Sequence, residues 1–589
     1  MRAGATRLLL LFLLCACIRA QTQVHYTVSL ADKDRHLVRV QVNLPPGEAS
    51  RELQLPVWNA LYQVRDFVQN MNWIRAEDPN GRTLPLRQLN KGRWQLNEAQ
   101  KGAQINYEMF ADTPGPYGAQ LNSHHAFFNL AEILVYADDQ RNSPVEVKFE
   151  RVPAKWKHAT SLSFNASGYH ADNYDRLVDS PIEIGMFAEK LFTGACGTYQ
   201  VLFDDENAVP LLDKVVPTIK RIVDGATKWM NDCPFAKYLF IYHVADSSDG
   251  GMEHAFSTAI TLPASVFEKD PDRFIGITTH EFVHLWNVKR IRPQSLEPVD
   301  YTKENYTPAL WFSEGVDTTA ADCIELRAGL LDGRHFLDSL GQQITELESR
   351  PAHLNQSAEQ SSLDAWLEKY PRYSLPERSI SYYNKGNLLG VLLDLAMRNA
   401  SQDRASLREL FRFMNEHYAK QGKFFADSDA VREAAESLSH ANLGEFFQKY
   451  VSGVDEIPWD KFLAPVGLRA VTVEATFADP GFEAAQSFDQ PPIVVSVKTG
   501  GEAERAGLKS QDQVLRINGQ RTGRNYERQI AELAPGAMVS VVVRGEGVEH
   551  NLQWKLGKRE QMAYQITDLP QVTSEQKARR KAWLFDNPE

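Results

Sequence analysis

Cysteine and long apolar runs are scarce in this chain of 589 residues, and there is no excess of positive charge. Its 5 cysteines are too few for disulfides to be the main scaffold of so long a chain. The formal net charge is −12 at pH 7, so nucleic acid is not an expected partner. After residue 20, no run approaches the roughly 18 apolar residues of a membrane-spanning helix, and we expect no transmembrane segment. No Gly-x-Ser-x-Gly element occurs, and nothing else points to a serine nucleophile.

The first 20 residues form the one strongly apolar stretch. Arg2 and Arg7 stand before a leucine-rich run at residues 8–14. Small residues ending in Ile-Arg-Ala follow this run, up to Ala20. This order is typical of a secretory signal peptide, with cleavage after Ala20, and the apolar run is too short to span a membrane. We therefore expect an exported protein, periplasmic or secreted. Lipid attachment at Cys17 is a less favoured alternative.

Removal of the signal would leave Cys196, Cys233 and Cys323. We expect Cys196 to pair with Cys233 and Cys323 to be buried. None of the three has the local spacing of a metal-ligand set.

Residues 280–284 read His-Glu-Phe-Val-His and have the chemistry of a hydrolytic metal site. Residues four apart lie on one face of a helix, so His280 and His284 can aim two ring nitrogens at one ion. Glu281 lies on the flank of that face, where its carboxylate could hold a metal-bound water. Two structural histidines on a buried helix face are the alternative. Helix-spaced apolar neighbours and a stop at Pro293 favour a metal site within a helix.

A catalytic zinc ion needs a third protein ligand and one open position. Thr307 and Pro308 predict the start of a second helix, and Glu314 follows about two turns later. Beside Leu310 and Trp311, a carboxylate is costly unless it is paired or bound to metal. A solvated glutamate is the alternative.

The stretches HEFVHLWNVKRIRP and LWFSEG together resemble the glycyl aminopeptidase family, in the thermolysin-like clan of zinc peptidases. The resemblance implies one zinc ion bound by His280, His284 and Glu314, with Glu281 as the general base. It also implies peptide substrates with a free N-terminus, beginning with Gly or Ala. The interval between His284 and Glu314 is longer than in the best-known clan members, so residues 288–306 are predicted to fold aside as a loop.

Asp317 and Asp322 follow Glu314 on the same predicted helix. Metal-bound histidines normally donate their other N–H to a carboxylate or carbonyl, and either aspartate is a candidate. Both could equally be solvated charges.

A second motif, Gly250-Gly251-Met252-Glu253-His254, stands before the predicted zinc helix and opens an alternating run. It resembles the Gly-x-Met-Glu-Asn strand of related zinc aminopeptidases, with histidine in place of asparagine. The resemblance implies that Glu253 binds the substrate's free amino terminus and that residues 250–252 contact substrate. An ammonium entering a cleft needs a carboxylate partner, which restricts cleavage to the chain end. A glycine-rich turn before an edge strand is the alternative.

A third motif, Ser381-Tyr382-Tyr383-Asn384-Lys385-Gly386, is similar to the Tyr-x-Lys-Gly element of those relatives. The resemblance implies that the Tyr383 hydroxyl stabilises the oxyanion. Tyr382 remains the alternative.

The length predicts a multi-domain α+β protein. Short alternating strands with turns predict an N-terminal antiparallel β domain over 21–165. Helical patterns predict a mainly helical domain over 166–463, which the resemblance makes thermolysin-like and which holds every site candidate. In the tail, 561–589, a short helix is expected at 576–585.

Residues 464–560 have a different sequence pattern, with strands in place of long helices. The strand 493–497, the segment 502–508 and the strand beginning at Asp512 resemble a PDZ domain. Such domains take a peptide by adding it to a sheet edge. Residues 482–492 lack a clear carboxylate-binding loop, so a peptide ligand and a purely structural role both stay open.

Three functional hypotheses follow. The first is an exported zinc aminopeptidase, and the second is a zinc endopeptidase in which Glu253 has another role. The third is a PDZ-type binding protein with an idle zinc site, which Glu281 argues against because water activation is what requires a glutamate there.

Overall fold

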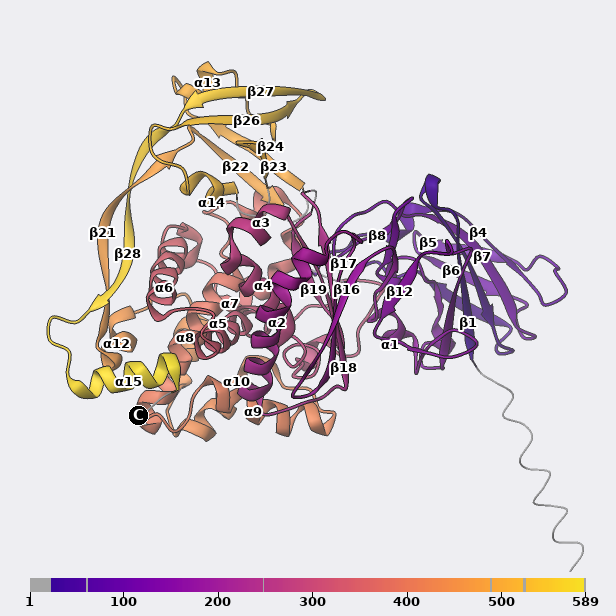
Figure 1. Ribbon diagram of the computed structural model, residues 1–589, viewed down its shortest axis with the longest axis horizontal. Coiled ribbons are helices and arrows are strands. Elements are labelled where there is room, and N and C mark those ends of the chain that lie inside the picture. Colours follow the sequence, from indigo (N-terminus) through magenta and orange to yellow (C-terminus); the bar gives the residue numbers. More distant parts are fainter. Residues whose placement is uncertain (1–22, 60–61, 247, 488–489, 523–525, 587–589) are drawn as a thin grey trace, which may run out of the picture. The chain divides into compact units, whose positions relative to one another are not determined.

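The computed structural model describes residues 23–59, 62–246, 248–487, 490–522 and 526–586 (Figure 1). The predicted signal peptide, Cys17 included, lies outside these residues. The chain divides into two compact units. Unit 1 takes the N-terminal part up to Met186 together with Tyr301–Lys303, and unit 2 takes the rest, including Tyr62, Gln63 and Val64.

Unit 1 is built from β-strands, as the alternating pattern predicted. Its largest sheet has the order β13 (Ser163–Phe164), β14 (Tyr169–Ala171), β11 (Val145–Glu150), β1 (Val24–Asp32), β2 (Leu37–Leu44), β7 (Ala103–Phe110), β4 (Met71–Glu77). Two four-stranded sheets have the orders β10 (Tyr136–Ala137), β3 (Ser50–Gln54), β6 (Arg93–Asn97), β5 (Leu86–Asn90), and β12 (Lys157–Thr160), β15 (Ile182–Gly185), β9 (His125–Phe128), β8 (Ala119–Leu121). The β1–β11 pairing is parallel, whereas β1–β2 and β2–β7 are antiparallel.

Residues 166–186 lie in unit 1, past the predicted domain boundary at 165. The reason is strand pairing, since β14 pairs with β11 and β15 pairs with β9. The short helix α1 (Tyr174–Val178) begins at Asn173, whose side chain accepts a hydrogen bond from the Arg176 amide.

Part of the predicted loop 288–306 also belongs to unit 1. Tyr301 is 8% exposed, and its ring lies 6.1 Å from that of Tyr136 and 5.9 Å from that of Tyr174, between centroids. The Arg141 guanidinium lies 4.7 Å from the centre of the Tyr301 ring, and the Tyr301 carbonyl accepts a hydrogen bond from the Val57 amide at 2.9 Å. This short segment therefore completes the core of unit 1.

Unit 2 begins with a five-stranded sheet. Its order is β16 (Ala188–Gly194), β17 (Gly197–Phe203), β18 (Lys237–Val244), β20 (Ser257–Leu262), β19 (Gly250–Glu253). The strands β17, β18 and β20 run parallel, and β19 is an antiparallel edge strand. The strand that carries the predicted substrate-binding motif therefore lies at an edge of the sheet.

The rest of this region, up to residue 463, is mainly helical, as predicted. Its α-helices are α2 (Val209–Met230), α3 (Ala264–Lys269), α4 (Pro271–Val283), α5 (Asp317–Ala328), α6 (Gly333–Glu348), α7 (Ala358–Leu363), α8 (Tyr382–Ser401), α9 (Leu407–His417), α10 (Asp427–Ser439), α11 (Gly444–Phe446), α12 (Trp459–Leu463). One hydrophobic core joins these helices to the sheet and includes the fully buried Trp286 and Trp311. Apolar burial on this scale is the main stabilising contribution to such a fold.

The second predicted helix starts differently from expectation. Thr307 Oγ1 accepts a hydrogen bond from the Ala309 amide, but residues Trp311–Val316 form a π-helical turn before α5 begins. This turn packs on α8 where Gly315 faces Gly386. A Cβ on either glycine would overlap the other element's backbone, so the close approach requires glycine at both positions.

A ribbon of two twelve-residue strands, β21 (Leu468–Asp479) and β28 (Gly557–Asp568), leads to a C-terminal β domain. The sheet of that domain has the order β22 (Phe482–Ser487), β23 (Gln490–Val497), β24 (Gln513–Ile517), β26 (Met538–Gly545), β27 (Val548–Lys555), with β25 (Gln520–Arg521) on β24. Two short helices, α13 (Glu502–Arg505) and α14 (Tyr526–Ala531), complete a separate hydrophobic core. The helix expected at 576–585 is confirmed as α15 (Ser574–Phe585), with a capping box at Thr573.

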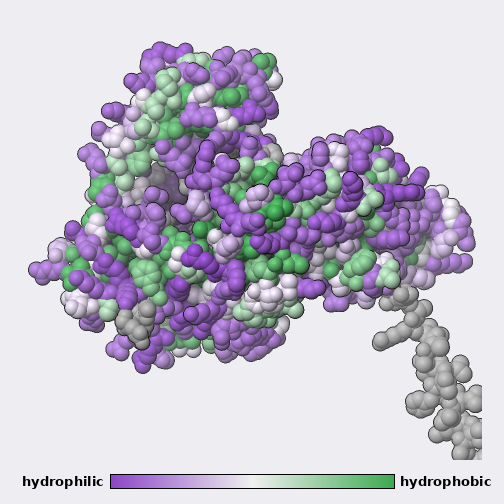
Figure 2. Space-filling model, viewed as in Figure 1, coloured by the Kyte–Doolittle hydropathy of each residue, from purple (hydrophilic) through white to green (hydrophobic). Residues whose placement is uncertain are grey.

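Most of the surface in Figure 2 is hydrophilic, with apolar residues in scattered patches. Among the described helices, none has the length and apolar character that crossing a membrane requires. The expected multi-domain organisation, β-rich at the N-terminus and helical beyond it, is confirmed.

Candidate metal and active site

The three predicted ligands meet at one point in unit 2. His280 comes from the last turn of α4, His284 caps that helix, and Glu314 lies in the π-helical turn. The Nε2 atoms of the two histidines are 3.0 Å apart. Glu314 Oε2 lies 3.5 Å from Nε2 of His280 and 3.3 Å from Nε2 of His284.

These separations fit a tetrahedral zinc ion. Zinc binds histidine nitrogen and carboxylate oxygen at about 2.0–2.2 Å, so two ligand atoms of a tetrahedral site lie about 3.3 Å apart. His284 and Glu314 are buried at 1% and 4% exposure, and such polar groups need a partner. Two imidazoles and one carboxylate converging on one point are the donor set of a catalytic zinc site, with a fourth position left for water.

Glu281 lies beside the ligands. Its carboxylate, the His284 ring and Glu253 each offer an atom within 4.8 Å of the others. Gly251 on β19 packs directly against Glu281, and a Cβ at this position would overlap the carboxylate. The strand that carries Glu253 therefore passes close to Glu281 because residue 251 has no side chain.

Asp317 lies behind both histidines, as one of the two sequence candidates predicted. Its carboxylate is 3.4 Å from Nδ1 of His280 and 3.8 Å from Nδ1 of His284. The other candidate, Asp322, is half-buried, and its side chain hydrogen-bonds to Asn387. Of the two candidates, Asp317 is therefore the one beside the rings, and it lies nearer to His280 than to His284.

Asn287 orients the site in a way that sequence reasoning missed. Its carbonyl lies 2.6 Å from His284 Nδ1, and its side-chain amide donates to the Phe312 carbonyl at 3.2 Å and to Asp317 Oδ1 at 3.2 Å. One residue thus joins the end of α4 to the π-helical turn. A polar residue three positions after the motif is the only sequence signal, and it is weak.

Charge and burial shift the pKa values of the site residues in different directions. Burial and the neighbouring His284 lower the pKa of His280. Burial lowers that of His284 as well, but Asp317 and Glu314 outweigh it, and the net shift is upward. Burial raises the pKa of Glu281. Burial would also raise that of Glu314, but His284 and His280 lower it overall, so this carboxyl stays ionised.

The two candidate tyrosines occupy different environments. Tyr382 is 2% exposed and packs in a small cluster with Leu310 and Ala365. Tyr383 is partly exposed, and its ring centre lies 6.1 Å from that of His280. Of the two, Tyr383 is the one beside the metal ligands.

Tyr62 is a further neighbour that no motif suggested. It packs against the Tyr382 and Tyr383 cluster, and burial and then the charges of Glu314 and Glu253 raise its pKa. Its position in the chain, more than 200 residues before α4, gave no sequence signal.

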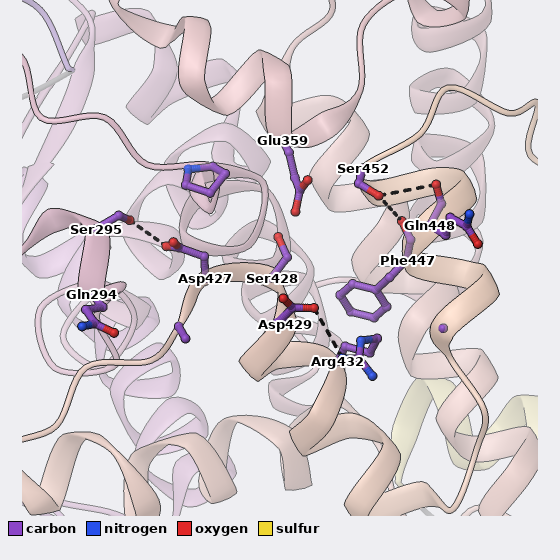
Figure 3. A pocket seen from close by; sticks show the side chains of 13 residues that line it. Gln294, Ser295, Glu359, Asp427, Ser428, Asp429, Arg432, Phe447, Gln448 and Ser452 are labelled. Carbon is purple, nitrogen blue, oxygen red and sulfur yellow. Dashed lines mark hydrogen bonds and ion pairs between the residues drawn. The ribbon is translucent and has the colours of Figure 1, made fainter.

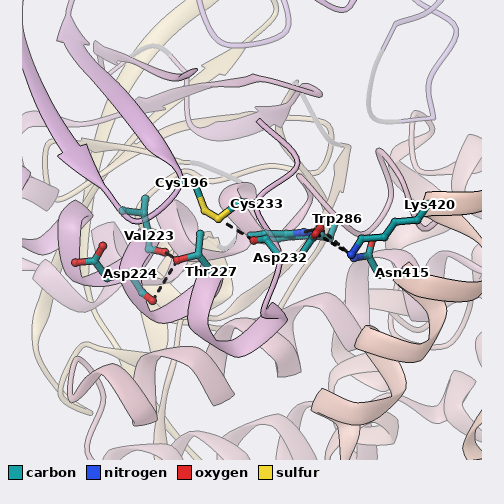
Figure 4. Close-up of a disulfide and its surroundings, with 9 residues drawn as sticks. All are labelled: Cys196, Val223, Asp224, Thr227, Asp232, Cys233, Trp286, Asn415 and Lys420. Carbon is teal, nitrogen blue, oxygen red and sulfur yellow. Dashed lines mark hydrogen bonds and ion pairs between the residues drawn. A yellow bond between two sulfur atoms is a disulfide. The ribbon is translucent and has the colours of Figure 1, made fainter. Parts of the chain in front are cut away.

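The predicted disulfide between Cys196 and Cys233 is confirmed, and it lies near the end of α4 (Figure 4). Asp232, next to Cys233, accepts a hydrogen bond from the Trp286 indole at 3.0 Å. Asn415 donates to the same carboxylate at 3.0 Å, and Lys420 lies 3.1 Å from it. Cys323 is free and buried, also as expected.

A pocket of about 810 Å³ lies elsewhere in unit 2 (Figure 3). Its lining includes Ser295, Glu359, Asp427 and Arg432, and none of the predicted site residues. Two pairs of lining residues interact, Ser295 with Asp427 and Asp429 with Arg432. Among the described residues, the groups that could hold a metal ion include no residue of this lining.

Comparisons with known families agree with this geometry. Residues 25–186 match the peptidase M61 N-terminal domain, and residues 273–389 match the M61 glycyl aminopeptidase domain. The second match contains His280, Glu281, His284, Glu314 and Tyr383. No curated protein matches the chain.

Among solved structures, an aminopeptidase N family protein from Idiomarina loihiensis is similar at 24% identity and a TM-score of 0.76. The alignment covers 95% of this chain and 100% of that one, so the two share a fold. An M1 zinc metallopeptidase from Deinococcus radiodurans aligns at 12% identity and a TM-score of 0.45 over 74% of this chain and 94% of that one. The matched glycyl aminopeptidase domain, with the ligand cluster inside it, makes this chain a metallopeptidase.

Proposed function

We propose that the protein is a zinc aminopeptidase that removes the N-terminal residue, Gly or Ala, from peptides. The observation that carries the proposal is the arrangement of His280, His284 and Glu314 at tetrahedral ligand spacing, with Glu281 and Glu253 beside them. A zinc ion held there would polarise the scissile carbonyl and lower the pKa of a bound water to about 7.

The side chains around the ligands have distinct roles in this reaction. Glu281 accepts the proton of the attacking water and passes it to the leaving amine. Burial raises its pKa, which suits a group that must both take and release a proton. The Tyr383 hydroxyl donates to the developing oxyanion.

Glu253 sets the position of the cut. A carboxylate beside the general base pairs with the substrate's terminal ammonium and places the first peptide bond at the site. Because β19 is an edge strand, residues 250–252 can pair with the backbone of an extended substrate. The preference for Gly or Ala rests on the matched family.

Matched peptides with free and N-acetylated termini test the exopeptidase assignment. The wild-type enzyme should cleave the free peptides only, because an acetylated terminus has no charge for Glu253. Glu253→Ala should raise KM for free peptides by about tenfold or more, the loss of one charge-assisted hydrogen bond, and should leave N-acetylated peptides uncleaved. Equal cleavage of both sets would instead support the endopeptidase alternative.

Glu281→Gln tests the mechanism. The variant should retain zinc, since Glu281 is not a ligand, and lose at least about a thousandfold in kcat, within the range of general acid–base catalysis. Full activity of the Glu281→Gln enzyme would show that Glu281 is not the general base. If the wild-type protein cleaved no peptide under any condition, the hypothesis of a binding protein with an idle zinc site would be favoured.

The remaining parts of the proposal concern location and the C-terminal domain. An exported, periplasmic or secreted protein is supported by the signal-like N-terminus and by the Cys196–Cys233 disulfide. A PDZ-like C-terminal domain is supported by β23, α13 and β24, which follow the predicted order.

A further inference from the structure

Strand β22 is one of the two outermost strands of the C-terminal sheet, and an added peptide could pair along it. Two backbone positions on this edge already have partners within the chain. The Ala484 amide donates to the Tyr526 hydroxyl at 3.1 Å, and that hydroxyl donates to the Ala484 carbonyl at 3.0 Å. The Gln486 amide donates to Ser374 Oγ at 3.0 Å, and Ser374 Oγ is also in hydrogen-bonding contact with the Gln486 carbonyl.

Ser374 does not belong to the C-terminal domain. It ends the short 3-10 turn Pro371–Ser374, seven residues before Ser381, which caps α8. Its hydroxyl therefore occupies the place of an incoming strand's backbone, opposite both polar groups of Gln486.

Hydrogen bonds continue from Ser374 to the start of α8. Arg350 donates to the Ser374 carbonyl at 2.6 Å and to the Ser379 carbonyl at 2.8 Å. The Ser379 hydroxyl donates to the Tyr373 carbonyl at 2.6 Å.

The next residue, Ile380, is held on both sides. Its amide donates to Gln356 at 2.9 Å, and its carbonyl accepts from Ser361 at 2.9 Å. Ser381 then accepts from the Asn384 amide at 3.3 Å, which caps the helix that carries Tyr383. An unbroken series of contacts thus joins Gln486 to the residue beside His280.

We propose that the C-terminal β domain binds the chain's own segment 371–374 at its β22 edge, and that Ser374 is thereby a positioning residue for Tyr383. The inference rests on the proposed function, because it gives Tyr383 a role in the reaction. An extended peptide could reach the Gln486 position only by displacing Ser374.

Ser374→Ala tests the inference in the full-length zinc enzyme. Loss of this hydroxyl removes the contact with Gln486, and kcat should fall about fivefold, the equivalent of one ordinary hydrogen bond, with KM unchanged. Ser374→Thr keeps the hydroxyl and should restore kcat. Tyr526→Phe is the matched control, because it removes a hydroxyl from the same edge without a connection to α8, and its kcat should equal that of the wild type.

A double-mutant cycle with Tyr383→Phe separates positioning from general destabilisation. If Ser374 acts through Tyr383, then Ser374→Ala should have no further effect on kcat in the Tyr383→Phe background. Additive losses, an unchanged kcat in Ser374→Ala, or an equal loss in Tyr526→Phe would each overturn the inference. Failure of the proposed function itself would show separately, as an active Glu281→Gln enzyme.

Discussion

Glu281 and Glu314 are both buried carboxyl groups next to the same histidines, yet their pKa values shift in opposite directions. Glu314 lies between two imidazoles that stabilise its charge, whereas burial dominates at Glu281. A permanently ionised carboxylate suits a metal ligand, and a carboxyl that is easily protonated suits a proton carrier. The two proposed roles differ because of position, since the residue type is the same.

Gly251 offers a direct test of how closely β19 approaches Glu281. Gly251→Ala should displace the Glu281 carboxylate and lower kcat by about a hundredfold, the effect of a misplacement of about 1 Å, while zinc content stays at one ion. Steady-state kinetics and metal analysis check both parts.

Gly276→Ala is the matched control for this substitution. Gly276 lies on α4, and a Cβ added there would meet no other atom within 4 Å. Alanine there should leave kcat unchanged and stabilise the helix by up to about 1 kcal/mol. A Gly251→Ala enzyme as active as this control would show that Glu281 adapts to the added methyl group.

At the scale of elements, the site depends on how α4, the π-helical turn and α8 are held together. Glycines at 315 and 386 permit the π-helical turn and α8 to approach closely, and Asn287 joins α4 to the π-helical turn. Asp232 accepts a hydrogen bond from Trp286, two residues after His284. Each is a contact between segments distant in sequence.

The disulfide is expected to stabilise the loop that carries Asp232. It closes a loop with a sequence separation of 37, for which chain entropy predicts a contribution of about 4 kcal/mol. Reduction should lower the thermal midpoint of unit 2 and weaken zinc binding, because Trp286 would lose a fixed partner. Melting curves and zinc titrations with and without reductant measure both effects.

The Cys196→Ser/Cys233→Ser enzyme is the control for reduction. It should melt at the midpoint of the reduced wild type and show no response to reductant, since Cys323 is buried. A wild-type midpoint that reductant leaves unchanged would contradict the expected stabilisation.

These same contacts explain which parts of the site could be predicted from the sequence. Helix periodicity placed His280 and His284 correctly, because their relation depends only on local helix geometry. The π-helical turn around Glu314 was not predicted, since it arises where that turn meets α8 across Gly315 and Gly386. Asn287 and Tyr62 were missed for a similar reason: each acts through a tertiary contact that leaves no local pattern.

The β-strand character of the N-terminal domain could be predicted from the sequence, but the position of its C-terminal boundary could not. In the sequence, Val38, Val40, Val42 and Leu44 alternate with polar residues, and all four side chains are buried in β2. The strands beyond 165 are short, and what assigns them to unit 1 is their pairing with β9 and β11. Pairing partners across such distances are not encoded in local periodicity.

On the scale of the whole molecule, the two units should respond to different conditions. A bound ion at a thousand times its Kd adds about 4 kcal/mol to the stability of the part that binds it. Removal of zinc with a chelator should therefore lower the melting transition of unit 2 and leave that of unit 1 in place. His284→Ala enzyme should show the lowered transition without chelator, and identical wild-type curves with and without chelator would refute the prediction.

Unit 1 should instead respond to pH through Glu132. Burial raises the pKa of this 4% exposed carboxyl to about 8. The folded unit therefore keeps a proton that the unfolded chain releases above its ordinary pKa of about 4.3, so stability falls as pH rises from about 4.5 to 8.

Glu132→Gln should remove this dependence because glutamine stays neutral. Compared with the variant, the wild-type unit 1 midpoint should fall as pH rises from 5 to 8, as followed by calorimetry. Glu48→Gln, at an exposed position of the same unit, should follow the wild-type curve. Parallel wild-type and Glu132→Gln curves would show that Glu132 ionises normally.

Tyr301 determines how much of the chain must be synthesised before unit 1 can fold completely. The core of unit 1 requires a side chain that the ribosome adds more than a hundred residues after Met186. A nascent chain that ends before residue 301 therefore holds every strand of unit 1 but leaves the space beside Tyr136 and Tyr174 unfilled. Folding of the N-terminal unit would be finished only when α4, the helix that carries His280, has already been made.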